Sequence, residues 1–375
     1  MTVIGITGAN GFFGWHLRCR LVTFGIPFVA ADRSTFASES LLDRFVEQSD
    51  VIVHLAGVNR AENPEDVRSG NIELAQALVD AMVRTGTSCD VIYANSTKAA
   101  DPGPYGESKA GAASILGAHA ELHSSNFCDI RFPHLFGEFG RPNYNSAVTT
   151  FAHQLAHGDT STVNDGDLEL LHIQDACKLI MDLVAELPEG LTKHQPAGVQ
   201  ISVPAVYEVM SRLADYATTG TIPLIRDDVF ELRLFNTIRS QMWPDAYAFP
   251  LTRHADHRGA FFEVVRAWGQ GQTSISTTVP GVVRGEHYHF DKIERFAVVS
   301  GEASIRVRRL FTDDVVEFPV SGDEPCFIDM PPLCTHDITN TGESELVTLF
   351  WSHDHFDPDN ADTWPMKVVG EERAA

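Results

Sequence analysis

The sequence predicts a doubly wound parallel α/β sheet in residues 1–245, followed by an all-β sandwich or barrel in residues 246–375. In the first part, short apolar strands alternate with helical segments, which is typical of a parallel sheet. In the second part, short β-rich runs follow one another between turns. The sequence Trp243-Pro244-Asp245 lies where one pattern gives way to the other, so we place the domain boundary there.

The chain begins with a strand, a glycine-rich turn and a helix. Val3–Thr7 is apolar, the turn runs from Gly8 to Gly14, and Trp15–Phe24 is helical. Such a turn holds the pyrophosphate of a dinucleotide at the helix N-terminus, where free N–H groups and the helix dipole favour anions. Its glycines permit the tight turn, the approach of the phosphates and the close packing of helix on strand. The cofactor-binding residues predicted here are Gly8, Gly11, Phe12 and Gly14.

The end of the second strand bears on which dinucleotide is bound. Pro27–Ala31 ends at Asp32 and Arg33. An acid at this position usually accepts hydrogen bonds from the adenosine ribose, whereas an adjacent Arg can accept a 2′-phosphate. Both residues are present, which leaves NAD possible. We favour NADP(H) because Arg33 follows the strand end directly.

Two further strands continue the sheet. Val51–Gly57 is a buried strand that ends in small residues, residues 71–84 form an amphipathic helix, and Cys89–Ala94 is a strand that ends at Ser96 and Thr97. In a doubly wound sheet, ligands bind at the carboxyl ends of the strands. We therefore expect Ser96 to face a ligand.

The hexapeptide Pro104–Lys109 contains a Tyr and a Lys four residues apart. On a helix, Tyr105 and Lys109 lie on one face, about one turn from each other. A phenol has an ordinary pKa near 10, and a neighbouring ammonium lowers it. This pair therefore predicts a tyrosine that acts as a general acid or base.

These motifs together resemble the extended short-chain dehydrogenase/reductases, which have a Rossmann fold, over residues 1 to about 180. The resemblance implies that Tyr105 donates the proton, that Lys109 activates it and binds the nicotinamide ribose, and that Ser96 binds the substrate oxygen, with Thr97 as the alternative. It also implies cofactor contacts at Leu55 and Ala56, and a sugar nucleotide against residues 131–146, where Asn143 is the expected contact. One difference is that residues 168–172 lack an Arg that many relatives place on the pyrophosphate.

The second part of the chain carries a cluster of metal-binding residue types. His287 and His289 alternate on one predicted strand and so share a face, while Glu294 and His336 can approach from other strands. Three imidazoles and one carboxylate suit Zn, Mn, Fe or Ni, and we favour one Zn. The spacings resemble both motifs of the cupins, except that Leu333 stands where a Gly is usual.

A second resemblance overlaps the first. Residues 256–263 and 281–287 resemble the cupin epimerases that act on nucleotide-linked 4-keto sugars. In that family, the positions matching Arg258, Glu263 and Arg284 touch the substrate and the one matching His287 is the base. A metal-bound His cannot easily also take a proton. We favour the metal, which leaves the epimerisation base unassigned.

Composition narrows the class of partner. The chain has 375 residues and a formal net charge of −23, which argues against a nucleic-acid partner. Its six cysteines are scattered, as is typical of reduced thiols. We identify no signal peptide and no run long enough to span a membrane, and therefore expect a cytoplasmic protein.

A reductase fused to a cupin resembles one family over nearly the whole chain: the bifunctional enzymes of capsule and O-antigen sugar synthesis. The residues that carry this resemblance are His54–Arg60, Pro104–Lys109, Arg141–Ser146, His287–His289 and Glu294. It implies C3 epimerisation of a UDP-2-acetamido-2,6-dideoxy-4-ketohexose by the cupin, then NADPH-dependent reduction at C4 to UDP-N-acetyl-6-deoxy-L-talosamine, in a homodimer. Two alternatives stay open: a nucleotide-sugar reductase with a structural, dimerising cupin, and a non-enzymatic NADP-sensing regulator.

Overall fold

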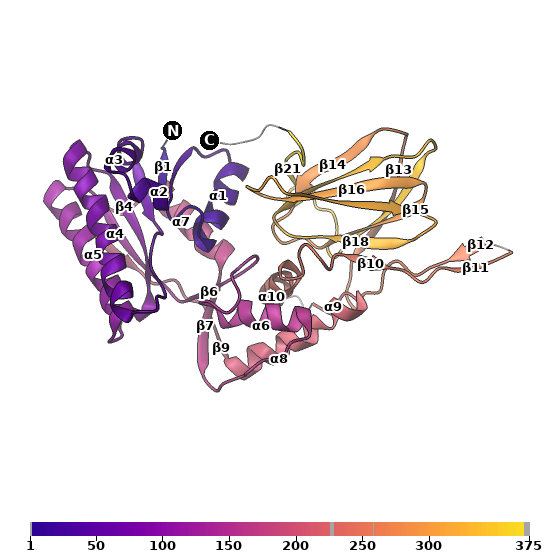
Figure 1. The fold of residues 1–375 in the computed structure, drawn as a ribbon, viewed down its shortest axis with the longest axis horizontal. Coiled ribbons are helices and arrows are strands. Elements are labelled where there is room, and N and C mark those ends of the chain that lie inside the picture. Colours follow the sequence, from indigo (N-terminus) through magenta and orange to yellow (C-terminus); the bar gives the residue numbers. More distant parts are fainter. Residues whose placement is uncertain (1, 226–228, 258, 371–375) are drawn as a thin grey trace. The chain divides into compact units, whose positions relative to one another are not determined.

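A computed structural model describes residues 2–225, 229–257 and 259–370 of the chain (Figure 1). The chain forms two compact units. The first comprises the residues up to Phe136 together with Asp167–Ser202, and the second comprises Gly137–Gly166 together with the described residues from Val203 onward. The sequence predicted domains at residues 1–245 and 246–375. The two compact units each combine separate stretches of the chain and do not test these ranges, which therefore stay a prediction.

A parallel six-stranded sheet is the centre of the first unit. Its strand order is β2-β1-β3-β4-β5-β8, and every neighbouring pair is parallel. From β1 the chain adds β2 on one side of the sheet and β3 on the other, so the direction of strand addition reverses between β1 and β3. Open α/β sheets bind ligands at such a switch point. The strands are β1 (Ile4–Thr7), β2 (Phe28–Ala31), β3 (Val51–His54), β4 (Asp90–Ser96), β5 (Phe127–Phe132) and β8 (Leu191–His194). A smaller sheet has the order β6-β7-β9, with β6 (His134–Phe136), β7 (Asp167–His172) and β9 (Val199–Ser202).

The helices of this unit begin earlier than the sequence pattern predicts. The predicted helix 71–84 is part of a helix that starts at Pro64, because Asn63 accepts a hydrogen bond from the Glu65 N–H and proline suits the first turn. The helices are α1 (Phe12–Thr23), α2 (Arg33–Phe36), α3 (Glu39–Glu47), α4 (Pro64–Thr85), η1 (Thr97–Ala100), α5 (Pro104–His123) and α7 (Ile173–Ala185).

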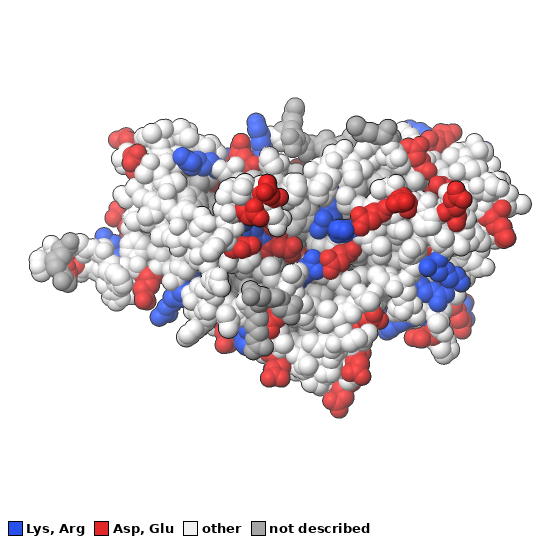
Figure 2. All heavy atoms as spheres, turned by 180° about the vertical axis from the view of Figure 1, so that it is seen from behind, with Lys and Arg blue, Asp and Glu red and all other residues white. Residues whose placement is uncertain are grey.

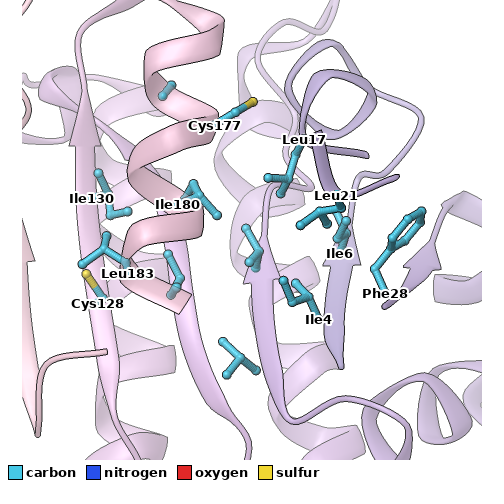
Figure 3. Close-up of a cluster of buried hydrophobic side chains, with 14 of the residues drawn as sticks. Ile4, Ile6, Leu17, Leu21, Phe28, Cys128, Ile130, Cys177, Ile180 and Leu183 are labelled. Carbon is cyan, nitrogen blue, oxygen red and sulfur yellow. The ribbon is translucent and has the colours of Figure 1, made fainter. Parts of the chain in front are cut away.

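One face of the large sheet is covered by α1 and α7. Figure 3 shows side chains of α7 beside those of β5, and side chains of α1 beside those of β1. The labelled members of this core are Ile4, Ile6, Leu17, Leu21, Phe28, Cys128, Ile130, Cys177, Ile180 and Leu183. Strands covered on both faces must be apolar throughout, which explains the continuous apolar runs in their sequences.

The second unit contains two five-stranded sheets, as expected of a cupin barrel. Their orders are β10-β18-β15-β20-β13 and β17-β16-β19-β14-β21. The strands are β10 (Ala248–Pro250), β13 (Gln272–Thr278), β14 (Val283–Tyr288), β15 (Glu294–Ser300), β16 (Glu302–Arg309), β17 (Val315–Ser321), β18 (Cys326–Met330), β19 (Cys334–Asn340), β20 (Leu346–Ser352) and β21 (Trp364–Pro365).

Helices and one hairpin complete the second unit. The helices are α6 (Ala147–His157), α8 (Val203–Ala214), α9 (Tyr216–Thr219) and α10 (Val229–Ser240). The first residues of the predicted helix 227–242 lie outside the described residues. Strands β11 (His254–Asp256) and β12 (Gly259–Phe261) form a separate hairpin that extends away from the two five-stranded sheets (Figure 1).

The surface carries charges of both signs. Figure 2 shows Lys and Arg interspersed with Asp and Glu on one face, in a chain whose formal net charge is −23. In the described ranges, no helix is both long enough and apolar enough to cross a membrane.

Candidate functional site

The glycine-rich turn lies between β1 and α1, where the backbone leaves no room for side chains. Gly8 has a φ of +68°, and a Cβ there would lie 2.8 Å from the Ala56 nitrogen. A Cβ at Gly14 would lie 2.3 Å from the Gly8 carbonyl oxygen. Gly11 is the N-cap of α1 and has no side chain to occupy the first N–H groups. These N–H groups are therefore available to an anion.

The ends of β1 and β3 are held together by Thr7, which the sequence analysis did not single out. Its hydroxyl accepts hydrogen bonds from the Leu55 and Ala56 N–H groups, both at 3.1 Å. Its own proton therefore goes to Nδ1 of His54, 2.8 Å away. Burial lowers the pKa of His54 to about 3, so the imidazole is neutral and can accept. The predicted cofactor contacts Leu55 and Ala56 thus lie beside the glycine turn.

Asp32 and Arg33 lie at the start of α2, and both are exposed. The Oδ1 atom of Asp32 accepts hydrogen bonds from Ser34 and Thr35, and this bonding, above all that of the Ser34 hydroxyl, lowers the pKa of Asp32. Its Oδ2 atom makes no hydrogen bond to the described residues. The Arg33 guanidinium likewise forms no ion pair with them.

The three predicted catalytic residues come from the end of β4 and the first turns of α5. The Tyr105 phenol lies close enough to the Ser96 hydroxyl for Ser96 to affect its pKa. Lys109 is 5% exposed, and its Nζ donates to the Ala94 carbonyl at 3.0 Å and lies 4.8 Å from the centre of the Tyr93 ring. Thr97, the alternative to Ser96, is the first residue of η1. The strand end and the helix thus bring Ser96 and Tyr105 into contact.

The electrostatics of this group differ from the expectation. Burial raises the pKa of Tyr105, and the neighbouring Ser96 side chain opposes this effect without cancelling it. Burial also lowers the pKa of Lys109 to about 8, against the opposing effect of Asp129. The expected lowering of the Tyr105 pKa by Lys109 is not found, because the burial of the phenol itself has the largest effect on this pKa.

Two buried polar pairs support this group, and sequence reasoning missed both. Asn95 donates to Asp129 at 2.7 Å, behind the end of β4. Asn71 of α4 donates to the Ser108 hydroxyl at 3.0 Å and to the Val58 carbonyl at 2.8 Å. The sequence did contain a signal for Asn71: it is a polar residue on the apolar face of a predicted helix, and such residues are usually hydrogen-bonded.

The four predicted metal ligands converge inside the barrel. The candidate ligand atoms of His287, His289, Glu294 and His336 all lie within 4.8 Å of one another. The three Nε2 atoms lie 3.8, 3.1 and 3.5 Å from Glu294 Oε2, for His287, His289 and His336 in that order. A bulge in β14 between Gly285 and His287 resets the alternation of side chains, and Glu286 there has a φ of +57°.

The donor set suits a cation. Burial acts to raise the pKa of Glu294, but the interactions of its carboxylate with the three neighbouring imidazoles outweigh burial and hold this pKa well below its usual range. Burial lowers the pKa of His336 to about 4, which keeps the imidazole neutral. Its Nδ1 lies 3.3 Å from the Cys334 carbonyl, while its Nε2 is buried and makes no hydrogen bond. A buried nitrogen of this kind, aimed at a carboxylate, fits a metal ligand.

A cavity of about 230 Å³ lies next to Glu294. Three aromatic side chains and several hydrogen-bonding groups form its wall. The lining residues are Gln272, Ser274, Lys292, Glu294, Phe350, Trp351, Ser352 and Phe356. The wall thus combines aromatic surface with a majority of polar side chains, which can hydrogen-bond a polar small molecule.

The predicted substrate residues lie apart from this cluster or outside the described residues. Arg258 lies outside them. Glu263 follows the exposed hairpin and lies 3.7 Å from Arg266, while exposed Arg284 of β14 donates to the Thr277 carbonyl. Neither makes a hydrogen bond or ion pair with the four-residue cluster. Asn143 belongs to the second unit, is exposed, and has a φ of +56°.

Comparisons with known proteins match both parts of the chain. Residues 4–195 match the NAD dependent epimerase/dehydratase family, and residues 254–364 match the polysaccharide biosynthesis C-terminal domain. The chain is 32% identical over 370 residues to the UDP-2-acetamido-2,6-beta-L-arabino-hexul-4-ose reductase of Pseudomonas aeruginosa, an alignment that covers 97% of this chain and 98% of that protein. It is 26% identical over 134 residues to the spore coat polysaccharide biosynthesis protein SpsL of Bacillus subtilis, which covers 32% of this chain and 89% of that protein.

Solved structures are similar over the same ranges. The capsular polysaccharide assembling protein CapF from Staphylococcus aureus is 30% identical, with a TM-score of 0.61, and the match covers 98% of this chain and all of that one. RMD from Pseudomonas aeruginosa, solved with NADPH, is 17% identical with a TM-score of 0.55, and the match covers 64% of this chain and 99% of that one. Because the identity to RMD is only 17%, that similarity concerns the fold alone.

Proposed function

We infer the function of this chain from its family: it belongs to the NAD dependent epimerase/dehydratase family, and over nearly its whole length to the bifunctional reductase–cupin enzymes of capsule and O-antigen sugar synthesis. It is accordingly an NAD(P)-dependent enzyme of nucleotide-sugar metabolism. The specific reaction we propose is C3 epimerisation of a UDP-2-acetamido-2,6-dideoxy-4-ketohexose in the cupin. Reduction at C4 by NADPH follows, and gives UDP-N-acetyl-6-deoxy-L-talosamine.

This proposal rests on one observation: each of the two parts of the chain contains the side chains that its proposed reaction needs. The contact between Ser96 and Tyr105, with Lys109 one helical turn away, supports a carbonyl reductase. The convergence of four ligand-type side chains beside a cavity supports a second centre in the barrel. A purely structural barrel does not require three imidazoles aimed at one carboxylate.

The order of the two steps follows from carbonyl chemistry. A ketone at C4 acidifies the proton on C3, so C3 can invert only while C4 is still a ketone. Epimerisation therefore precedes reduction. A reductase that acted first would remove the group on which the epimerisation depends.

The reduction uses the side chains of the first unit. Bound NADPH supplies the hydride to C4. Ser96 donates a hydrogen bond to the C4 oxygen and Tyr105 gives that oxygen its proton, since the raised pKa keeps the phenol protonated at neutral pH. Lys109 holds the ribose next to the nicotinamide, and Gly8, Gly11 and Gly14 leave room for the pyrophosphate.

The choice of NADP(H) is supported by the arrangement at α2. Asp32 uses Oδ1 to cap the helix, which leaves only one carboxylate oxygen for a ribose hydroxyl. The neighbouring Arg33 is exposed and available to a 2′-phosphate.

The barrel chemistry rests on the four-residue cluster and the adjacent cavity. His287, His289, Glu294 and His336 would hold one divalent ion, with zinc the favoured one. Such an ion polarises a carbonyl oxygen and so favours loss of the neighbouring proton. The aromatic residues Phe350 and Trp351 give the cavity apolar surface, and polar groups such as Ser274 can bind sugar hydroxyls.

The remaining contacts are part of the same proposal. Asn143, Glu263, Arg284 and Arg258 are proposed to bind the UDP-sugar. A homodimer is the proposed assembly, supported by the edge strand β13, whose Ile275 is 68% exposed. Light scattering at several concentrations tests the assembly.

The proposal is tested by supplying the UDP-4-keto sugar and NADPH and identifying the product by NMR. We expect NADPH oxidation and a product inverted at C3. Reduction without inversion would leave a reductase with a structural barrel. A protein that binds NADP without oxidising NADPH on any such substrate would be a regulator instead.

A further inference from the structure

Asp362 lies in an exposed segment between β20 and β21, far in sequence from the predicted metal ligands. Its carboxylate accepts hydrogen bonds from three consecutive backbone N–H groups. Phe290 donates to Oδ1 at 3.0 Å, while Asp291 and Lys292 donate to Oδ2 at 2.8 and 2.9 Å. These residues form the turn that leads from His289 to Glu294, so one side chain holds the connection between two predicted ligands.

The backbone of Asp362 acts on one of these ligands directly. Its carbonyl oxygen is hydrogen-bonded to Nδ1 of His289. A carbonyl can only accept, so Nδ1 of His289 carries a proton. Nε2, which lies 3.1 Å from Glu294 Oε2, is then the nitrogen that would bind a metal ion. A contact of this kind fixes the tautomer and the ring orientation of a metal-binding His.

The conformation of Asp362 suits this double contact. Its φ is +42°, in the left-handed region that few residues other than glycine adopt. Trp364 also donates from Nε1 to Oδ1 of Asp362, at 3.2 Å. The several bonds to one carboxylate explain how the strained backbone persists at this position.

The same turn brings a cation to the cavity. Lys292 lines the cavity together with Glu294, and its Nζ lies 3.5 Å from the Thr363 hydroxyl. No carboxylate of the described residues pairs with it. The turn held by Asp362 therefore sets the position of Lys292, the only Lys or Arg among the described residues that line the cavity.

We propose that Asp362 is a positioning residue that prepares the barrel site: its carboxylate shapes the turn 290–292, and its carbonyl orients His289 so that Nε2 faces the predicted metal site. This inference rests on the metal site of the proposed function. It adds a residue that neither cupin motif contains and that touches no predicted ligand through its side chain.

The test uses the full chain, freed of metal and titrated with Co²⁺. Three variants are compared: Asp362→Ala, Asp362→Asn and, as a matched control in the same exposed segment, Asp359→Asn. Outer partners of metal ligands typically contribute about 10–100-fold to metal affinity. We expect a loss of that size for Asp362→Ala and a smaller loss for Asp362→Asn, since Asn also tolerates a positive φ and keeps one acceptor oxygen. Asp359→Asn should bind Co²⁺ as the unmodified chain does.

The absorption spectrum of bound Co²⁺ separates positioning from mere stabilisation. We expect Asp362→Ala to change the spectrum, because His289 is no longer held in place, and Asp362→Asn to restore most of it. A lower melting temperature with unchanged spectrum and affinity would contradict the inference. Should Asp362→Ala not fold, unaltered affinity and spectrum in Asp362→Asn would equally contradict it. If the unmodified chain binds no Co²⁺, the metal site itself fails, and this inference with it.

Discussion

The ion pair between Arg295 and Asp329 should contribute more to the stability of the second unit than any exposed pair. Both side chains are 0% exposed. Arg295 donates to the two carboxylate oxygens at 2.7 and 2.9 Å, and Tyr216 donates to the same carboxylate at 2.6 Å. Replacing Asp329 by Ala leaves the guanidinium buried without its counter-ion. Breaking a buried pair in this way costs about 3–5 kcal/mol, which lowers the melting temperature of a unit of this size by roughly 6–20 °C.

A matched pair in the same barrel gives the control. Asp337 is also 0% exposed and accepts from Arg306 at 3.0 and 2.6 Å, but the Arg306 side chain is 28% exposed. Water can solvate Arg306 when Asp337 is removed, so we expect Asp337→Ala to cost only about 1–3 kcal/mol. Thermal unfolding followed by circular dichroism measures both variants. Equal shifts for the two, or a shift under about 2 °C for Asp329→Ala, would refute the reasoning from burial.

Four further predictions concern the proposed reaction. Tyr105→Phe should lower NADPH oxidation by about 10²–10⁴-fold and leave NADPH binding intact, because only the phenolic proton is lost; more than about a tenth of the activity remaining would exclude the role. Arg33→Ala should weaken NADPH far more than NADH, whereas equal losses would indicate that Asp32 governs recognition and that the cofactor is NAD. Because burial brings the pKa of Lys109 to about 8, its ammonium is lost as the pH rises through that value, so reduction should fall above about pH 8. Activity that stays flat to about pH 9.5 contradicts this. His336→Ala should reduce the metal content from about one ion per chain and spare the reduction of a substrate already inverted at C3; unchanged metal content by elemental analysis would remove His336 from the site.

The fold could be predicted because its signals are local. Val51–His54 and Val315–Ser321 carry apolar runs or alternation that define strands without reference to the rest of the chain. A strand was predicted at His287 and His289 from their alternation, but the course of β14, which runs from Val283 to Tyr288, could not be predicted in this way. It contains Arg284, Gly285 and Glu286, and its bulge interrupts the alternation on which a strand prediction depends.

In the candidate site too, residues with a local sequence signal could be predicted, and residues that depend on distant contacts could not. The three His and Glu294 were named from spacing alone, and the structure brings their ligand atoms together. Thr7 and Asn71 were given no role, because the partners of their side chains, His54 and Ser108, lie 47 and 37 residues away in the sequence. The contact of Asp362 with His289 could not be predicted at all, since it uses a backbone carbonyl 73 residues away. The pKa of Tyr105 was expected to fall, but burial depends on the packing of the whole unit.

The central claim is that the barrel inverts C3 and the first unit reduces C4. It is tested most directly by incubating the metal-loaded chain with the UDP-4-keto sugar in D₂O, without NADPH, and following the C3 position by NMR. The account predicts that deuterium enters C3 in the unmodified chain and in Tyr105→Phe, and that His336→Ala loses this exchange. A C3 position that keeps its proton in the unmodified chain, while added NADPH is still oxidised, would contradict the account and leave the barrel without a chemical role.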